Sequence, residues 1–529
     1  MERMKMHSRD NVAWNVEAVG RLFPNALTEV MRDGKVVQAI DFDVLRQELS
    51  REIVEGREER YAFTWPDKRQ AILAANAPIA ATLRPVVEDS VGRDGKEGAF
   101  DSENLYIEGD NLDVLKLLQE TYLGKVKMIY IDPPYNTGND AFVYDDDFAM
   151  ENGEFIAASK GYDAEGNRTY DFRANNGSNG RFHTDWLNMI YPRLRVAKSL
   201  LADDGVIFIS VDYNENFNMR KVADEILGVQ SFIGEIYWES KTKSQNTKTA
   251  YNKLQPKAEM ILVYAKDRQR RFHLIEKGVK EYPFSDERGV YREYPVEVMN
   301  ASGVRGRESM IYEISDTVST VFPPAGKQWK LGQAQVATYL KNGDLFIRDG
   351  KPIIKMRPNG ERNETTEPFW GFFDKTMGTA ESAKKELGEL IENHGFETVK
   401  PVEIIKRLCF HATDKDALIL DFFSGSATTA HAVMQLNAED GGYRKFIMVQ
   451  LPETTDEGGT AYRAGYRNIC EIGKERIRRA GAKIAAEAGE KAAGLDLGFR
   501  CLRLDTSNMT DVYYAPDAVT QDGLFAQVD

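Results

Sequence analysis

Two apolar runs with a helical stretch between them lie within residues 104–135, and this pattern constrains the fold more than any other part of the sequence. The first run covers 105–107 and leads to Asp110, while the second covers 126–131 and stops before Asp132. Between them, apolar residues recur at the spacing of a helix. A strand, a helix and a second strand in this order predict two parallel, neighbouring strands. Ligands bind at the carboxyl ends of strands in such sheets, and Asp110 and Asp132 both fall there.

The second run continues directly into Asp132-Pro133-Pro134-Tyr135, a stiff turn that holds several polar groups in a small space. Proline has no N–H and disfavours helix for the residue before it, so the chain stays extended here. The Asp132 carboxylate and the Pro133 carbonyl can then accept the two hydrogens of an exocyclic amino group, while Tyr135 stacks on the heterocycle that carries it. The alternative is a rigid turn with no chemical role.

A second pattern of strand and turn occurs far downstream, in the sequence ALILDFFSGSATTAHAVM at 417–434. A buried run ends at Asp421, small residues follow at 424–427, and two threonines open a helical pattern. Small residues let the backbone approach a ligand, a carboxylate suits a ligand ammonium, and a helix N-terminus suits a ligand carboxylate. The lysine of a phosphate-binding loop is missing from this stretch, so an amino-acid-bearing cofactor fits better than a phosphate. A tight turn without a ligand is the alternative.

The composition is typical of a globular, multidomain protein. The chain has 529 residues, of which 42% are hydrophobic, enough for two or three cores. No run approaches the roughly 20 apolar residues of a membrane span, so we expect no membrane partner and a cytoplasmic, nucleoid-associated location. The three cysteines, Cys409, Cys470 and Cys501, have no partners at ligand spacing, which predicts neither a disulfide framework nor a metal site.

The net charge of −14 argues mildly against a polyanionic partner, but a basic segment interrupts the acidic chain. Residues 241–277 contain ten basic and three acidic residues, with aromatic residues interleaved. Basic and amide side chains of this kind contact phosphates and base edges. The alternative is a solvated basic surface. The DNA-contact candidates in this segment are Lys241, Lys243, Lys248, Lys253, Arg270 and Arg271.

Together, the DPPY tetrad and the FFSGSA turn are similar to the motifs of DNA amino-methyltransferases of the beta order, in which the catalytic motif precedes the cofactor motif. The chain further resembles the modification (Mod) subunits of Type III restriction-modification systems. This resemblance implies an α/β fold: a mostly parallel, Rossmann-like, S-adenosylmethionine-dependent methyltransferase sheet, circularly permuted, with an inserted target-recognition domain. The segments that carry it are RYAFTWPDKRQAILAANAP at 60–78, ENLYIEGDNLDVLKLLQ at 103–119, FHTDWLNMIYPRL at 182–194, KPVEIIKRL at 400–408, KFIMVQLPE at 445–453 and GFRCLRLDTSN at 498–508.

The resemblance also implies roles for individual residues. Asp110, placed at the end of a strand next to the catalytic one, would contact the adenine of S-adenosylmethionine. Ala427 stands where the family has glycine, and Gln450 ends a strand where related enzymes often have an acid on the cofactor ribose, so Gln450 or Glu453 would take that contact. The implied catalytic residues are Asp132, Pro133, Pro134 and Tyr135, and the other implied cofactor contacts are Asp421, Phe423, Ser424 and Gly425.

These patterns divide the chain into five predicted regions. We expect a complete catalytic pocket, because every motif that it needs lies before residue 460. We expect impaired assembly, because Type III relatives typically continue beyond the short last region. The regions are an N-terminal helical arm at 1–100, a catalytic part at 101–238, a target-recognition domain at 239–399, a cofactor-binding part at 400–490 and a C-terminal segment at 491–529.

The predicted activity is transfer of a methyl group from S-adenosylmethionine to adenine N6 in duplex DNA, with the base flipped out of the helix. Two alternatives stay open: a subunit that mainly reads DNA sequence for a nuclease, and an N4-cytosine methyltransferase, although those enzymes usually carry serine in place of Asp132. The sequence contains no helicase or nuclease motif. The expected partners are therefore duplex DNA, a second copy of the chain and a restriction (Res) subunit that supplies cleavage.

Overall fold

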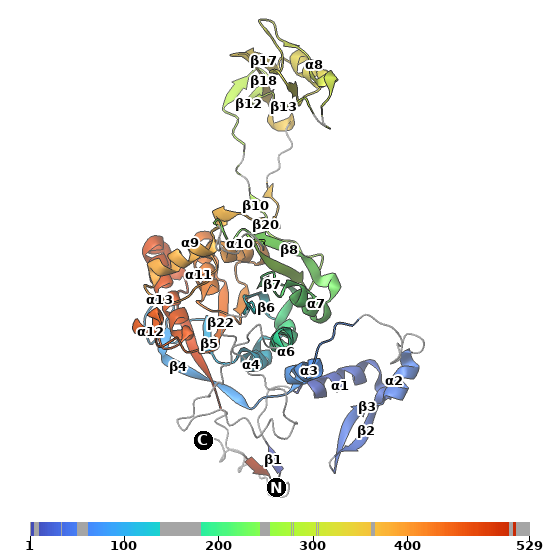
Figure 1. The fold of residues 1–529 in the computed structure, drawn as a ribbon, viewed down its shortest axis with the longest axis vertical. Helices are drawn as coiled ribbons and strands as arrows, with labels where there is room; N and C mark the ends of the chain where they lie inside the picture. The colour runs from blue at the N-terminus through green and yellow to red at the C-terminus, as the bar shows by residue number, and fades with distance from the viewer. Residues whose placement is uncertain are drawn as a thin grey trace. The chain divides into compact units, whose positions relative to one another are not determined.

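The computed structural model shows two compact units, which we describe separately (Figure 1). The larger unit comprises Met1–His273 and Trp370–Asp529, and the smaller comprises Leu274–Phe369. The structure describes residues 2–4, 10–32, 34–49, 62–137, 181–243, 254–276, 278, 280–302, 304, 306–360, 366–506 and 512–514.

A ten-stranded sheet forms the centre of the larger unit. Six of the neighbouring strand pairs are parallel and three are antiparallel, which confirms the predicted α/β fold with a mostly parallel sheet. In spatial order the strands are β20 (Phe372–Phe373), β8 (Phe232–Trp238), β9 (Glu259–Ala265), β7 (Leu201–Val211), β6 (Val126–Ile131), β21 (Leu418–Asp421), β22 (Lys445–Gln450), β5 (Leu105–Glu108), β23 (Phe499–Thr506) and β4 (Ala81–Val91).

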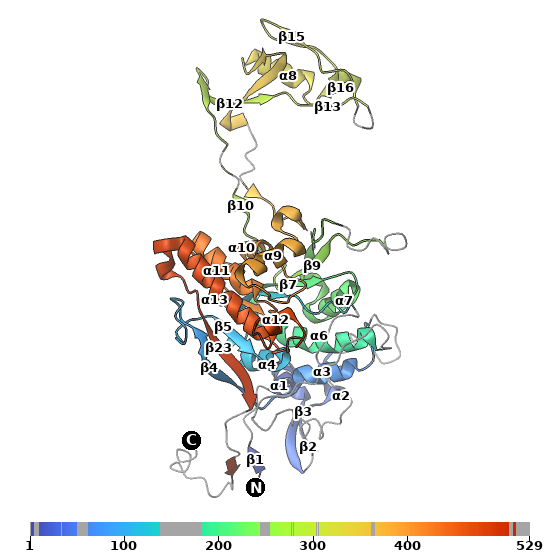
Figure 2. The ribbon, with the colours of Figure 1, turned by 60° about the vertical axis from the view of Figure 1, so that its left-hand side comes forward.

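Helices cover both faces of this sheet (Figure 2), which is why its central strands are continuous apolar runs. On one face, side chains such as Ile129 and Ile209 share a core with the helices that cover that face. The other face carries Tyr106, and a Cβ added at Gly473 of α13 would come 2.7 Å from its hydroxyl. The helices are α4 (Asn111–Tyr122), α6 (Phe182–Leu200) and α7 (Asn216–Leu227) on the first face and α10 (Val402–Ala412), α11 (Thr428–Asp440) and α13 (Ile469–Ala488) on the second.

The strand order corrects one prediction about the site. Strands β5 and β6 run in the same direction, but they are not neighbours, because β21 and β22 lie between them. The hydrophobic pattern of residues 104–135 indicates that both strands are buried, yet it carries no information about which strand pairs with each edge. As a result, Asp421 at the end of β21, rather than Asp110 after β5, lies on the strand adjacent to the one that leads into Asp132.

The N-terminal region is less helical than predicted. It contains a hairpin of β2 (Leu27–Arg32) and β3 (Lys35–Ile40), and its last strand, β4, pairs antiparallel with β23 in the central sheet. The predicted helical arm at 1–100 is therefore wrong for its final part, where the side chains of β4 are packed against the sheet core. The helices of this region are α1 (Asn11–Leu22), α2 (Phe42–Leu49) and α3 (Lys68–Asn76), and a short strand β1 (Glu2–Met4) pairs with β24 (Val512–Tyr514).

The smaller unit has a core of its own around Trp329 and Ile354. It is narrower than the predicted insertion at 239–399, because β9 joins the central sheet and α9 (Ala380–Leu390) belongs to the larger unit. Its elements are β10 (Ile275–Glu276), β11 (Phe284–Asp286), β12 (Gly289–Pro295), β13 (Val298–Asn300), β14 (Ile314–Ser315), β15 (Thr320–Val321), β16 (Lys327–Trp329), α8 (Gln333–Lys341), β17 (Leu345–Arg348), β18 (Lys351–Met356) and β19 (Thr366–Glu367).

Among the described helices, none combines the length and the apolar composition that crossing a lipid bilayer would require.

Candidate active site at the carboxyl edge of the sheet

Two carboxylates lie at the ends of adjacent strands. Asp132 follows β6 and is half-buried, while Asp421 ends β21 and is almost completely buried. The Asp421 carboxylate accepts hydrogen bonds from the Thr429 hydroxyl at 2.6 Å and from the Phe423 N–H at 3.1 Å. Burial raises the pKa of Asp421 to about 7, and the nearby Asp132 charge also raises it. Both predicted motifs therefore meet at one edge of the sheet.

The turn after Asp132 is held on both sides. The indole N–H of Trp186 in α6 donates to the Pro134 carbonyl at 2.8 Å. Asn136 adopts a positive φ of 56°, and its side-chain amide donates to Glu215 at 2.7 Å and to the Phe182 carbonyl at 3.2 Å. Asparagine tolerates this backbone region better than most residues. These contacts fix the direction in which the chain leaves β6.

Lys400 and Glu259 complete the surroundings of the turn, and sequence reasoning assigned no role to either. The Lys400 ammonium lies 2.9 Å from both carboxylate oxygens of Asp132 and 2.7 Å from the Tyr135 hydroxyl. That hydroxyl donates to Glu259 at 3.1 Å, and Glu259 lies 3.3 Å from Lys400. Burial raises the pKa of Tyr135 well above its usual range, and the Asp132 and Glu259 charges raise it further, so its hydroxyl stays protonated.

The loop after Asp421 has two residues in the left-handed region. Gly425 has a φ of 49° and Ala427 a φ of 60°. The glycine of the family pattern would adopt this conformation without strain at 427, whereas alanine costs about 1–2 kcal/mol there. Phe423 and Ser424 are buried, and the Ser424 hydroxyl lies beside that of Tyr106. This part of the loop is thus packed against the core.

The other predicted cofactor contacts already have partners within the chain. The Gln450 side chain accepts from the Gly425 N–H at 2.7 Å and donates to the Leu451 carbonyl at 3.3 Å, so it shapes the loop. Asp110 caps α4 through the Leu112 and Asp113 N–H groups, and it pairs with the buried Arg193 at 2.9 Å. Glu453, the remaining predicted contact, is half-buried, and burial raises its pKa to about 7.

Comparison with known proteins identifies the family. Residues 126–478 match the DNA methylase family. The chain is 34% identical to the Type III restriction-modification enzyme StyLTI Mod subunit of Salmonella typhimurium, over 89% of this chain and 71% of that protein. It is 34% identical to the EcoPI Mod subunit of Escherichia phage P1, over 85% and 72% of the two chains. For the EcoP15I Mod subunit of Escherichia coli the identity is 31%, over 81% and 70%. The chain belongs to the Type III Mod subunits of the DNA methylase family.

In this Mod subunit the described parts of the predicted basic segment lie at two opposite edges of the sheet. Strand β9 runs antiparallel to β7, so it carries the chain from the edge that holds Glu259 to the opposite edge. Arg270 lies at that opposite edge and donates to the carbonyls of Asp204 and Ala412. The DNA contacts of Arg270 and Arg271 stay predictions, and they lie at a different edge from Lys241 and Lys243. Lys241 and Lys243 lie before β9, and Lys248 and Lys253 are outside the described residues.

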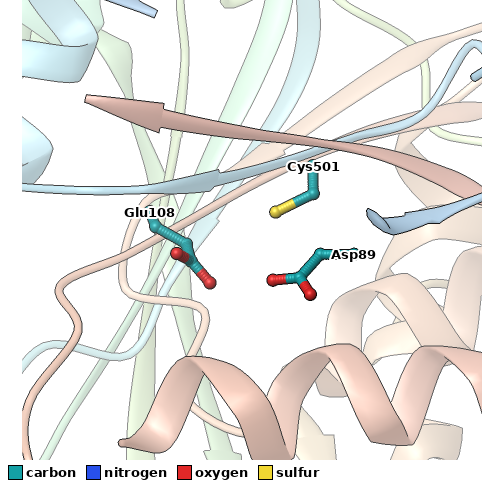
Figure 3. A group of neighbouring side chains, drawn as sticks. All are labelled: Asp89, Glu108 and Cys501. Atoms are coloured by element: carbon teal, nitrogen blue, oxygen red, sulfur yellow. The ribbon is translucent and has the colours of Figure 1, made fainter. Parts of the chain in front are cut away.

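A cluster of acidic and thiol groups lies on the neighbouring strands β4, β5 and β23 (Figure 3). Asp89, Glu108 and Cys501 point toward one another, with ligand atoms within 4.8 Å. The Lys474 ammonium contacts both carboxylates, at 2.6 Å from Glu108, and the Arg503 guanidinium donates to Glu108 at 3.1 Å. Burial raises the pKa of the Cys501 thiol to about 12. The charges are thus satisfied by cationic side chains, which makes the cluster an ion-pair network of the Mod subunit.

Proposed function

We propose that this Mod subunit transfers a methyl group from S-adenosylmethionine to the N6 amino group of adenine in duplex DNA. The observation that carries the proposal is the position of the Asp132 turn and the Asp421 loop at the ends of two adjacent parallel strands. Ligands of such sheets bind at this edge, so one group of residues can hold the acceptor base while the other holds the cofactor.

The residues around Asp421 suit the amino-acid part of this cofactor. Asp421 makes no ion pair with the described residues, and its carboxylate is buried, so a ligand ammonium would satisfy a charge that the protein leaves unmatched. The N-terminus of α11 suits the ligand carboxylate, and Gly425 has no side chain to block its approach. We assign these residues, with Phe423 and Ser424, to the cofactor. S-adenosylmethionine would supply the methyl group on its sulfonium.

On the DNA side, Asp132 and Pro133 would orient the target amino group. The Asp132 carboxylate and the Pro133 carbonyl accept its two N–H groups, and Tyr135 stacks on the adenine ring. The nitrogen lone pair would take the methyl group while the electron pair of the carbon–sulfur bond stays on sulfur, and one N–H proton would be released to water. No covalent intermediate with the protein is needed. A paired adenine must leave the helix to reach this turn, so we propose base flipping.

We further propose that duplex DNA, a second copy of this chain and a restriction subunit are partners. The relatives named above are subunits of restriction-modification enzymes, which supports an assembly with a cleaving partner.

Product analysis tests the proposed function. The chain is incubated with methyl-labelled S-adenosylmethionine and plasmid DNA from a methylation-deficient host, and the digested nucleosides are separated. We expect the label in N6-methyl-2′-deoxyadenosine. When the methylated adenines are mapped by sequencing, we expect them within one repeated sequence. Label in N4-methylcytosine would refute the adenine assignment, and binding of DNA without any transfer would favour a subunit that only reads sequence.

A further inference from the structure

Lys400 occupies an unusual position for a lysine. Its side chain is only 9% exposed, and its ammonium is surrounded by four oxygen atoms from Asp132, Tyr135 and Glu259 at 2.7–3.3 Å. It also lies 4.9 Å from the centroid of the Tyr135 ring and 5.6 Å from that of Trp238. Lysine is rarely buried unless it is paired in this way.

Three separate segments bring this ammonium to the turn. Lys400 lies just before α10, Glu259 begins β9, and Trp238 ends β8. The Trp238 indole N–H donates to the Gly378 carbonyl at 2.8 Å, which fixes the ring beside the lysine side chain. Since each of these groups is anchored by its own strand or helix, the ammonium is held in place by the fold instead of reaching the turn from a mobile loop.

Two carboxylates share one ammonium at this position. Asp132 and Glu259 bring two carboxylates into a partly buried site, and Lys400 supplies the cation that both contact. Burial lowers the pKa of Lys400, but the Asp132 and Glu259 charges outweigh it, so its pKa lies above the usual lysine value. Without the ammonium the two carboxylates would repel each other, and protonation of one would relieve that repulsion. A protonated Asp132 would be a poorer acceptor for an amino group.

We propose that Lys400 is a positioning residue for methyl transfer: its ammonium orients the Asp132 carboxylate through both of its oxygens and fixes the Tyr135 hydroxyl beside it. This inference rests on the proposed function. A carboxylate has about four acceptor sites, so Asp132 can contact Lys400 and still accept an N–H of the target base. Lys400 thus acts through Asp132 and Tyr135.

The test uses Lys400→Met, which keeps the length and loses the charge, and Lys400→Arg, which keeps the charge. Lys384→Met is the control, because Lys384 lies on α9, is about half exposed and pairs with Glu397, outside the turn. We expect Lys400→Met to lower kcat about 100-fold, within the range for lost acid–base or electrostatic assistance, with cofactor affinity changed less than about twofold. We expect Lys400→Arg to recover part of the rate.

The pH dependence separates positioning from a merely structural role. The titratable groups that face Lys400 are Asp132, Tyr135 and Glu259, with Tyr130 and Asp421 near Asp132. We expect the acidic limb of the rate profile to move to higher pH in Lys400→Met and to stay in place in Lys384→Met. A Lys400→Met enzyme with the wild-type rate and profile would overturn the inference, as would a slow variant with an unmoved profile and no recovery in Lys400→Arg. An inactive wild-type chain would instead refute the proposed function.

Discussion

At the scale of single residues, the two carboxylates at the active edge have different environments and therefore suit different partners. Asp132 contacts the Lys400 ammonium, so its negative charge is already balanced within the protein. Among the described residues, Asp421 accepts only neutral hydrogen bonds, from Thr429 and the Phe423 backbone, and burial raises its pKa to about 7. Pairs of acids whose surroundings differ in this way commonly divide the work of a site. Asp132 suits an amino group that donates hydrogen bonds, and Asp421 suits a cationic ligand group.

The first prediction concerns Asp132. We expect Asp132→Ala to reduce methyl transfer by at least about 1,000-fold, because the target amino group loses its charged acceptor. Cofactor binding should survive, since Asp421 and its loop belong to another strand. Equilibrium dialysis with labelled cofactor and a transfer assay measure the two effects. Asp203→Ala is the control, because that carboxylate is fully exposed at the other end of β7. Substantial turnover by Asp132→Ala would contradict the assignment.

A second prediction follows from the pKa of Asp421. Because the folded-state pKa is raised from 3.8 to about 7, this group destabilises the fold as the pH rises from about 4 to 7. The shift corresponds to about 4 kcal/mol as an upper limit. We expect Asp421→Asn to have a melting temperature close to that of the wild type at pH 4.5 and above it at pH 7.5, without cofactor. A difference independent of pH would show that Asp421 is not buried in an unfavourable ionised form. The same variant should bind the cofactor weakly.

The residues of the site were only partly predictable from the sequence. The tetrad and the small-residue turn stand out because each follows an apolar strand directly, so local pattern and function coincide. Lys400 lies 268 residues from Asp132 along the chain, and Glu259 lies 124 residues from Tyr135. No local pattern indicates that they meet. The segment KPVEIIKRL and the basic run around Glu259 were both visible in the sequence, but only the folded sheet brings them together.

At the scale of elements, strand order decides which groups can act together. The sequence predicts the direction of β5 and β6 correctly, since a helix connects them, but it does not show that β21 and β22 are inserted between them. The insertion could not be predicted because β21 and β22 come from a distant part of the chain. Strands also pair through backbone N–H and C=O groups, which almost every residue carries whatever its side chain. Strand β9 has a similar effect on the basic segment, because Lys241 and Arg270 lie at opposite edges of the sheet.

The third prediction tests whether the basic residues at the two edges of the sheet differ in their contact with DNA. We expect Lys241→Gln with Lys243→Gln to weaken binding to all DNA sequences and to reduce the salt slope by about 2, at roughly 0.9 per lost phosphate contact. These lysines precede β9 at the edge that holds Glu259, and Lys243 is largely exposed. Arg271→Gln is the matched control at the opposite edge, and we expect its slope to equal that of the wild type. Binding titrations at several salt concentrations measure both. Equal slopes in all three proteins would assign Lys241 and Lys243 to ordinary surface.

At the scale of the whole molecule, the smaller unit is an insertion that the larger unit does not need for its sheet. Its core residues, such as Trp329 and Ile354, pack among themselves. The chain enters and leaves it through β10 and β19, which pair antiparallel with Ile275 opposite Glu367 and Glu276 opposite Thr366. The sequence predicted an insertion here because the methyltransferase pattern stops. Its limits were too wide because β9 and α9 have no motif that marks them as part of the larger unit.

The last prediction uses this pairing to remove the smaller unit. Since Glu276 and Thr366 are paired opposite each other, a two-residue Asn-Gly turn can join them in a tight hairpin and replace residues 277–365. We expect the shortened chain to fold and to bind S-adenosylmethionine with nearly unchanged affinity, because the segments that carry Asp132, Asp421 and Lys400 remain. If the smaller unit reads DNA, the shortened chain should lose its sequence preference and methylate adenines slowly, if at all. Sequencing maps of methylated adenines, with cofactor binding as the folding control, measure both properties. A shortened chain that binds cofactor and still methylates the wild-type site at the wild-type rate would place sequence recognition in the larger unit.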